Sequence, residues 1–558
     1  MASNGSNGKK LEDYSKEELV ELVKDLKKRK KFGIVWEAKP EDVVEQCKRE
    51  LPVLKEVESL AIEKAPDQGT NLIIEGDNYH ALSVLNYTHA HSVDVIYIDP
   101  PYNTGAKDWK YNNDFIDSND TYRHSKWLAM MHSRLVLAKN LLKADGVLIV
   151  TIDDWESHHL QVLLEEVFPE RELATVVIEH NPKGLPSRNF SYSHEYAHFL
   201  IPNGSSVIGK DPTEKEDTRN LRRAGRASSR KERPTMFYPI YIRNGKVVRV
   251  GESPKTTFHP KHRNTKEKNG DIAVWPIDDQ GKERRWHFGL DSIQDHMGRI
   301  EVKTSRSGDI QLYASAIPGR YKTVWTGGEY DAGKYGTGVV KEMLGIEFPF
   351  PKSIFATAKC LETVTYDRPN ALILDFFAGS GTTGHATLYL NKKFGGNRQF
   401  ILCTNNENNI AREVTFPRIE KAINGVKTLP EITKIPANVR YFTTAFVPRD
   451  EVSDDTRRAL VARSTEMICV RENTFDKKYD NKQFKVYTNG KIATGILFDL
   501  DALEDFKKKL ITLKMPAHLY VFSLSNDVFA DDFSDLPVKH KLCPIPESIL
   551  EVYRKIFA

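Results

Sequence analysis

Apolar runs alternate with amphipathic stretches in the first half of the chain. Val93–Ile98 and Val147–Ile152 are β-branched and apolar on both faces, as buried parallel strands are. Helical patterns cover Ser125–Leu142, between these runs, and Trp155–Phe168, after them. This alternation predicts a doubly wound α/β sheet.

The same alternation returns after a long interruption. Ala371–Asp375 and Phe400–Cys403 are predicted strands, whereas residues 203–345 are rich in glycine, proline, charge and isolated aromatics. The chain therefore predicts one α/β domain that is built from two segments, with an insertion between them. The predicted parts are an N-terminal helical region at 1–64 (with helices at 16–31 and 39–64), a first domain segment at 65–202, an insertion at 203–345, a second segment at 346–435, and a mixed C-terminal region at 436–558.

Composition narrows the class of protein. The 558 residues are 40% hydrophobic and 28% charged, which is typical of a soluble globular protein. No run approaches the roughly 18 apolar residues of a membrane helix, and the first ten residues lack the apolar core of a signal peptide. We therefore expect a cytoplasmic protein with no membrane partner. The five cysteines form no CxxC pair, which argues against a structural zinc site.

The first chemical motif is Asp99-Pro100-Pro101-Tyr102, directly after a predicted strand. The amino group of an aromatic base is a poor nucleophile, because its lone pair is delocalised into the ring. A carboxylate at a strand end can accept hydrogen bonds from such an amine, and two prolines fix the backbone around it. The tyrosine can stack on a base that has left the duplex. A rigid turn with no chemistry explains a lone copy of this motif equally well.

The second motif runs from Asp375 to Thr383 and also follows a predicted strand. Its glycines allow close approach of a ligand to the backbone, and the following helix offers N–H groups to polar atoms. The turn lacks the lysine of a phosphate-binding P-loop, and its GxGxxG match at 379–384 is weak alone. Two such motifs in one chain, each at the end of a predicted strand, indicate a functional site far more specifically than either motif alone.

With both motifs in view, the sequence resembles the amino-methyltransferases of DNA. It is similar in particular to the β-ordered adenine-N6 group, which includes the modification subunits of type III restriction systems. In that group the catalytic motif precedes the cofactor motif, as Asp99 precedes Asp375 here. The resemblance covers about residues 33–425 and is carried by Asn71–Asn78, Val95–Gly105, Tyr122–Trp127, Gly146–Asp154, Ser193–Tyr196, Phe350–Ser353 and Phe376–Thr383.

The resemblance implies a Rossmann-like α/β fold that uses S-adenosylmethionine, and it implies roles for matching residues. Asp99, Pro100, Pro101 and Tyr102 would hold the target amine. Asp77 would reach the adenine of the cofactor, Lys352 and Ser353 would border its methionine end, and Glu407 would grip the ribose. The segment Thr404–Glu407 departs from the simplest family pattern at this position. The remaining implied cofactor residues are Asn78, Asp99, Asp375, Phe376, Phe377, Ala378, Gly379, Gly381 and Thr383.

The insertion contains a dense basic stretch at 219–233. Arginine neutralises phosphates and reads guanine edges, so we expect a target-recognition insertion that binds double-stranded DNA, although a solvated loop has the same composition. The candidate DNA-binding residues are Arg222, Arg223, Arg226, Arg230 and Arg285.

The predicted function is site-specific methylation of adenine N6 in DNA after base flipping, within a restriction-modification or related defence system. The alternatives are cytosine-N4 methylation, RNA methylation, and a DNA-recognition subunit without activity. An aspartate at position 99 favours adenine, since the cytosine group more often has serine there. A homodimer and a helicase or nuclease restriction subunit are candidate partners. The reaction needs no metal, and His80, His89 and His91 straddle a helix end and a loop, so we expect no metal site there.

Overall fold

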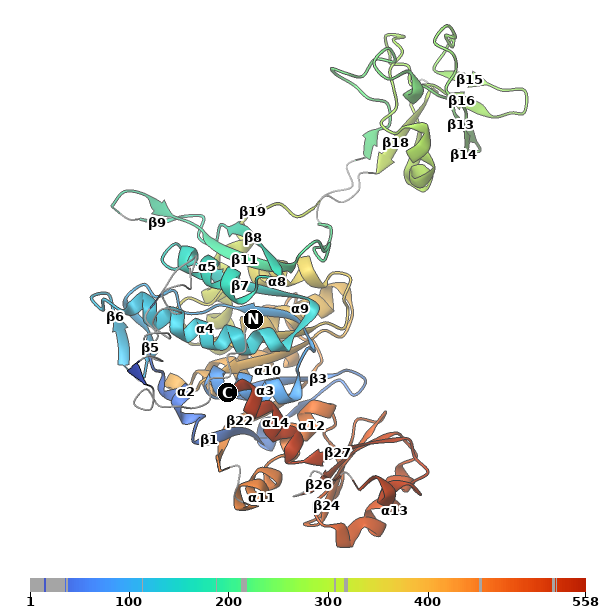
Figure 1. Cartoon of the computed structure of the whole chain (residues 1–558). Helices are drawn as coiled ribbons and strands as arrows, with labels where there is room; N and C mark the ends of the chain where they lie inside the picture. Colours follow the sequence, from blue (N-terminus) through green and yellow to red (C-terminus); the bar gives the residue numbers. More distant parts are fainter. Residues whose placement is uncertain are drawn as a thin grey trace. The chain divides into compact units, whose positions relative to one another are not determined.

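The computed structural model describes residues 15–16, 36, 39–112, 114–186, 188–211, 218–305, 308–315, 320–450, 454–523, 527 and 529–557. The chain divides into two compact units (Figure 1). The larger unit comprises residues 1–209 together with 322–558, and the smaller one comprises residues 210–321. A domain built from two separated segments was predicted, and this division has that form.

The larger unit is organised around one mixed sheet with strand order β1-β22-β3-β21-β20-β4-β7-β11-β8-β19, and β2 pairs with β22. The six strands from β22 to β7 run parallel, whereas β11 is antiparallel to both β7 and β8. The strands are β1 (Glu50–Glu56), β2 (Ile62–Glu63), β3 (Thr70–Glu75), β4 (Val93–Ile98), β7 (Leu142–Ile152), β8 (Arg171–Ile178), β11 (Glu195–Pro202), β19 (Val324–Trp325), β20 (Leu372–Asp375), β21 (Gln399–Thr404) and β22 (Asn438–Pro448).

Helices cover both faces of this sheet (Figure 1). One buried core joins one face to α3 (Asn78–Thr88), α4 (Arg123–Leu141) and α5 (Ser157–Val167). A second core joins the opposite face to α7 (Gly338–Leu344), α8 (Ile354–Thr365), α9 (Thr382–Phe394) and α10 (Phe416–Asn424). The result is a three-layer α/β/α domain, as the alternation of apolar runs predicts.

The chain switches faces between β4 and β20, which are neighbours in the sheet. After β4 it continues to α4 on one face, and after β20 it continues to α9 on the other. Loops that diverge in this way leave a crevice at the carboxyl ends of the strands, where open α/β sheets bind ligands. Both chemical motifs of the sequence occupy these two loops.

The N-terminal region differs from the prediction. Residues 39–64 were predicted to be helical, but only α2 (Asp42–Gln46) is an α-helix there. Leu51, Val53 and Leu54 are buried in β1, which pairs with β22 almost 400 positions later. A local pattern could not reveal that partner. The predicted helix at 16–31 falls almost entirely outside the described residues.

The insertion is shorter than predicted. Val324 and Trp325 form β19 on the main sheet, and Trp325, Tyr330 and Val339 are buried in the second core. Residues 322–345 therefore belong to the larger unit and not to the insertion. Their isolated aromatics resembled an insertion because they pack against segments that are distant in sequence.

The smaller unit has its own sheets and its own core. Its strand orders are β12-β18-β17 and β14-β13-β16-β15, and Leu221, Tyr238 and Trp286 are central to its buried cluster. Its elements are β12 (Thr218–Asn220), β13 (Ile240–Arg243), β14 (Lys246–Val250), β15 (Asn264–Lys266), β16 (Ile272–Val274), α6 (Leu290–Ile293), β17 (Ile300–Thr304) and β18 (Ile310–Ser315).

The C-terminal region is mixed, as predicted. Its first strand, β22, belongs to the main sheet, and Met467, Val470, Ile549 and Tyr553 join the first core through α12 and α14. A five-stranded sheet of order β23-β24-β25-β26-β27 completes it. Its elements are α11 (Asp454–Ala462), α12 (Thr465–Glu472), β23 (Asp476–Asp480), β24 (Phe484–Thr488), β25 (Ala493–Leu497), α13 (Leu503–Leu513), β26 (Ala517–Phe522), β27 (His540–Ile545) and α14 (Glu547–Ile556).

Among the residues that the structure describes, no helix combines the length and the apolarity needed to cross a bilayer.

Candidate active site

The loop after β4 is held in place from two neighbouring elements. The hydroxyl of Thr151, on β7, donates to Asp99 Oδ1 at 2.7 Å. The indole N–H of Trp127, on α4, donates to the carbonyl of Pro101 at 2.7 Å. The Pro101 carbonyl is thus engaged by the protein itself, and we assign it an anchoring role in the loop.

A compact charge cluster surrounds Asp99. Lys352 Nζ lies 3.2 Å from Asp99 Oδ1 and 2.5 Å from Glu195 Oε2, and it also donates to the hydroxyl of Tyr102. The Tyr102 hydroxyl donates to the same Glu195 oxygen at 3.0 Å. Glu195 is 2% exposed, whereas Asp99 remains 26% exposed. One ammonium therefore faces two carboxylates, and Asp99 keeps access to solvent.

Burial and these neighbours shift the pKa values in the cluster. Burial raises the pKa of Asp99, although Lys352 opposes that shift. Burial would also raise the pKa of Glu195, but Lys352 and His180 outweigh it and lower the pKa. For Lys352 burial favours the neutral amine, yet the two carboxylates prevail and raise its pKa. Lys352 is therefore held as a permanent cation between them.

The second motif forms a tight turn between β20 and α9. Asp375 is 2% exposed, and its carboxylate accepts from the backbone N–H of Phe377 at 2.9 Å and from the Thr383 hydroxyl at 2.6 Å. Burial nevertheless raises the pKa of Asp375 to about 7. Gly379 and Gly381 have φ of +47° and +77°, a region that favours glycine.

The two glycines face different surroundings. A Cβ on Gly379 would lie 3.8 Å from the Phe377 carbonyl oxygen, which is an ordinary van der Waals contact, whereas a Cβ on Gly381 would lie 3.2 Å from Thr415 Cγ2. Packing against Thr415 therefore restricts position 381, and the predicted contact of Gly381 with the cofactor remains a proposal. Gly379 lines open space.

Both motifs open on one pocket, with about 420 Å³ of space between atoms, part of it continuous with solvent. Of the predicted residues, it brings together Asp99, Lys352, Asp375, Phe377, Ala378, Gly379 and Thr383, and it is also lined by Tyr97, Phe348, Phe350, Pro351, Thr357, Ser380 and Thr382.

Other predicted cofactor residues lie outside this lining. Ser353 caps α8 and donates to a backbone carbonyl at 2.8 Å, and Phe376 is fully buried in the first core. Asp77 caps α3, and Asn78 donates to the Phe376 carbonyl at 3.0 Å, so Asn78 borders the turn after β20. Glu407 is exposed in the turn after β21. Their contact with a cofactor remains a proposal.

Two contributors to the site were not predicted from the sequence. Glu195 lies in a segment that carries the resemblance but had no predicted role in the site, and its partners Tyr102 and Lys352 lie 93 and 157 positions away. Arg418 is fully buried beneath the glycine-rich turn and donates to the hydroxyls of Ser380 and Thr382 at 2.9 and 2.7 Å. Burial lowers the pKa of Arg418 to about 9. The sequence offered no local signal for Arg418, because its burial depends on how α10 packs beneath the turn.

The candidate DNA-binding arginines divide into two groups. Arg230 and Arg285 are each 5% exposed and donate to backbone carbonyls within the smaller unit, at 2.6 and 2.8 Å. Arg222 is half-buried and donates to another carbonyl at 2.8 Å. These contacts stabilise the fold of the insertion. Arg223 and Arg226 are exposed and keep their guanidinium groups available to a partner.

The profile of the DNA methylase family matches residues 93–412 of this chain. The EcoPI Mod subunit of a type III restriction-modification enzyme, from Escherichia phage P1, is 30% identical over 65% of this chain and 61% of its own length. The type II methyltransferase M.KpnI of Klebsiella pneumoniae is 30% identical over 61% of this chain and 82% of its own length.

The chain thus spans less than two thirds of the length of the EcoPI Mod subunit. A solved structure of M1.HpyAVI in complex with SAM aligns with 13% identity and a TM-score of 0.29, over 62% of this chain and 98% of that one.

Proposed function

The chain belongs to the DNA methylase family, and we propose that it transfers a methyl group from S-adenosylmethionine to N6 of adenine in a specific double-stranded DNA sequence. One observation carries the proposal. Asp99 and the turn after Asp375 arise from adjacent parallel strands and open on the same pocket. An acceptor for an amine and a cradle for a small ligand therefore share one space.

The residues of the pocket fit the proposed cofactor, which would supply its methyl group as a substituent of a positively charged sulfur. The cluster of Lys352, Asp99 and Glu195 has a net negative charge when all three groups are ionised. Asp375 adds a fourth ionisable group with a pKa of about 7. Negative charge at a buried site favours binding of a cation, so the pocket suits a sulfonium.

Asp99 is the proposed acceptor for the target amine. Its carboxylate, 26% exposed, takes a hydrogen bond from Thr151 at 2.7 Å and faces Lys352 at 3.2 Å. A base that enters the pocket would replace the Lys352 contact with its own N–H, which orients the nitrogen lone pair toward the methyl group. Preorganised hydrogen bonds of this kind account for a large share of catalysis in many enzymes.

The inserted unit is the proposed reader of the DNA sequence, with Arg223 and Arg226 as exposed phosphate or base contacts. Similarity to the EcoPI Mod subunit supports a place in a restriction-modification system and a helicase or nuclease subunit as partner. We further propose that the C-terminal region mediates the formation of a homodimer.

Methylation in cells tests this function. DNA from a host that lacks other adenine methylation and expresses the chain should show N6-methyladenine at one recurring sequence by single-molecule sequencing. The Asp99→Ala variant should leave the same positions unmodified, and Glu165→Ala, at an exposed position of α5, should not alter them.

Methylation of cytosine at N4 would overturn the assignment of the base and retain the enzyme class. Unmodified DNA, together with binding of a specific sequence by the purified chain, would identify a recognition subunit without activity. Methyl transfer to RNA alone would replace the proposed substrate.

A further inference from the structure

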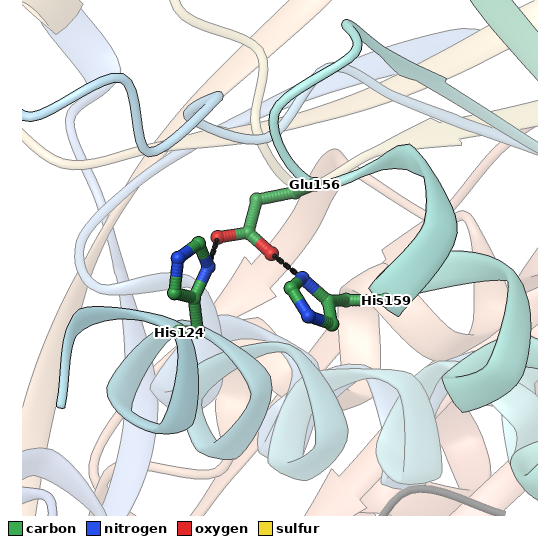
Figure 2. Close-up of side chains that lie close together, drawn as sticks. All are labelled: His124, Glu156 and His159. Atoms are coloured by element: carbon green, nitrogen blue, oxygen red, sulfur yellow. Dashed lines mark hydrogen bonds and ion pairs between the residues drawn. The ribbon is translucent and has the colours of Figure 1, made fainter.

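Two histidines, neither of which lines the pocket, converge on one glutamate (Figure 2). His124 lies in the first turn of α4, Glu156 directly precedes α5, and His159 lies in the first turn of α5. His124 Nδ1 is 2.5 Å from Glu156 Oε1, and His159 Nδ1 is 2.8 Å from Glu156 Oε2. The three side chains come from the ends of two helices that pack together in the first core, so the backbone holds them firmly.

The burial of Glu156 sets an electrostatic requirement. Its side chain is 0% exposed, and in the described part of the chain its ion-pair partners are these two imidazoles. An imidazole is charged only when it is protonated. A buried carboxylate needs a cation or a metal to offset the loss of its hydration. Within the described residues, no lysine or arginine, whose side chains are always charged near neutral pH, forms an ion pair with Glu156.

The candidate ligand atoms lie close together, all of them within 4.8 Å of one another. Bonds of about 2.0–2.2 Å from one tetrahedral metal place neighbouring ligand atoms roughly 3.3–3.6 Å apart. The nitrogen–oxygen distances of 2.5 and 2.8 Å are those of hydrogen bonds, so each imidazole must move back from Glu156 by about 1 Å or less when an ion binds. His124 and His159 are 37% and 22% exposed, so an ion can enter from solvent.

We propose that His124, Glu156 and His159 form a binding site for one divalent transition-metal ion of the zinc class. Two imidazoles and one carboxylate are a donor set that such ions accept, with a remaining position for water. The glutamate and the second histidine stand three residues apart at a helix start, which directs both toward one point. Hard ions such as magnesium prefer oxygen ligands and should bind poorly.

A second layer of contacts supports the site. The amide of Asn103, which is fully buried, donates to Glu156 Oε1 at 2.5 Å and orients the carboxylate. The guanidinium of Arg123 donates to His124 Nε2 at 3.2 Å. A metal on Nδ1 requires the neutral imidazole of His124 to have its single proton on Nε2, so the proton moves from Nδ1 to Nε2 and Arg123 must turn away when the ion binds.

The histidines singled out in the sequence were His80, His89 and His91, and no metal was expected there. In the structure His80 is buried against the carbonyl of Val43, and the three do not form a cluster of ligand atoms within the described residues. His124 and Glu156 are 32 positions apart, a separation that carries no signal in one sequence.

Metal binding by the untagged full-length chain tests the proposal. The protein is stripped with a chelator, dialysed against cobalt or zinc, and measured for bound metal and for visible absorption of cobalt. We expect roughly one ion per chain and cobalt bands of a site with nitrogen ligands. Zinc should raise the melting temperature, and magnesium at the same concentration should not.

Matched variants assign the site. Glu156→Gln and His159→Asn should lose stoichiometric binding and the cobalt bands, whereas His158→Asn, which removes an exposed histidine from the same helix turn, should retain both. His159→Asn decides the case if Glu156→Gln fails to fold, because His159 is partly exposed. Absence of stoichiometric metal in the wild-type chain, or equal binding by His159→Asn, would overturn the proposal and leave the cluster as a hydrogen-bonded network.

Discussion

At the scale of single residues, the proposed active site depends on how one ammonium is shared. Lys352 contacts Asp99 at 3.2 Å and Glu195 at 2.5 Å, so it stands where a donor from the substrate would approach Asp99. Glu195 is the more buried carboxylate and keeps Lys352 in place when Asp99 changes partner. This division assigns substrate contact to Asp99 and positioning to Glu195.

Asp99→Ala should reduce methyl transfer by on the order of a hundredfold or more, because the amine loses its acceptor. The glycine-rich turn is untouched, so affinity for the cofactor should stay within a few-fold of wild type. Single-turnover kinetics and calorimetry on the same preparation measure the two quantities. Turnover close to wild type would remove Asp99 from the mechanism.

Tyr102 should stack on an extruded base, which recovers about 1–3 kcal/mol of the cost of leaving the helix. Tyr102→Phe loses the hydroxyl that bonds to Glu195 but keeps the ring, and should retain most activity. Tyr102→Ala should lose much of it. A 2-aminopurine at the target position should brighten when Tyr102→Ala binds, since the variant has no ring there to quench it. Full activity of the alanine variant would rule out stacking.

Asp375 should make cofactor binding dependent on pH. Burial raises its pKa to about 7, and a bound cation favours the ionised form. Affinity should therefore rise between about pH 6 and pH 8, with release of a proton, and Asp375→Asn should flatten this dependence. Calorimetry in two buffers of different ionisation enthalpy measures the proton. A wild-type affinity that is constant over this range would show that Asp375 is not coupled to the ligand.

The same raised pKa has an opposite effect on the free protein. The carboxyl contributes most to stability below its unfolded pKa of about 3.9, and that contribution is lost as pH rises through about 7. Thermal melts of the wild type and Asp375→Asn should therefore diverge in slope between these values.

At the scale of elements, the turn between β20 and α9 must both pack against the protein and leave space for a ligand, and a different glycine meets each requirement. Gly381 begins α9 in a left-handed conformation against Thr415, and Gly379 borders the pocket. Arg418 ties the turn to α10 through Ser380 and Thr382. The turn is therefore rigid on one side and open on the other, as a ligand cradle must be.

Alanine substitutions should separate these two requirements. Gly379→Ala adds a methyl group beside open space and should weaken cofactor binding, at a backbone cost of about 1–2 kcal/mol. Gly381→Ala meets Thr415 at 3.2 Å, so it should lower the melting temperature further and affect the cofactor indirectly. Calorimetry and thermal melts on both variants make the comparison. Equal losses of stability and of affinity in the two would contradict it.

At the scale of the whole molecule, the proposed recognition residues and the proposed catalytic residues belong to separate compact units. Residues 210–321 have their own core around Tyr238 and Trp286, and the catalytic motifs lie wholly in the larger unit. Buried Arg230 and Arg285 serve that core, so the exposed arginines of the insertion are the ones available to nucleic acid.

Neutralising Arg223 and Arg226 together should weaken DNA binding. The slope of log affinity against log salt should fall by about one unit for each phosphate that no longer meets an arginine. Arg230→Ala is the contrasting variant, because it should destabilise the inserted unit by removing hydrogen bonds to Glu283 and to backbone carbonyls. Binding measured over a salt series checks the slope. An unchanged slope in the double variant would make the exposed arginines solvated surface.

Much of the fold was predictable because strands buried on both faces have a local signature. Val93–Ile98 was predicted with the same bounds as β4. The predicted strands Ala371–Asp375 and Phe400–Cys403 have ends within one residue of those of β20 and β21. The strand β1 and the role of residues 322–345 were not predictable. The strand β1 pairs with β22 almost 400 positions away, and Val324 pairs with Val177, 147 positions away (324 minus 177). A local pattern contains no information about such partners.

The candidate site divides in the same way. Contiguous motifs were enough to predict Asp99 as the acceptor, the turn after Asp375 and the place of Lys352. In such motifs a strand end, two prolines or two glycines constrain the backbone within a few residues. The pairing of Lys352 with Glu195, the burial of Arg230 and the meeting of His124 with Glu156 depend on which elements pack together. Local residue order therefore sufficed to predict which two loops border the pocket. The charges that surround these loops were set by long-range packing, since burial and proximity are properties of the folded chain.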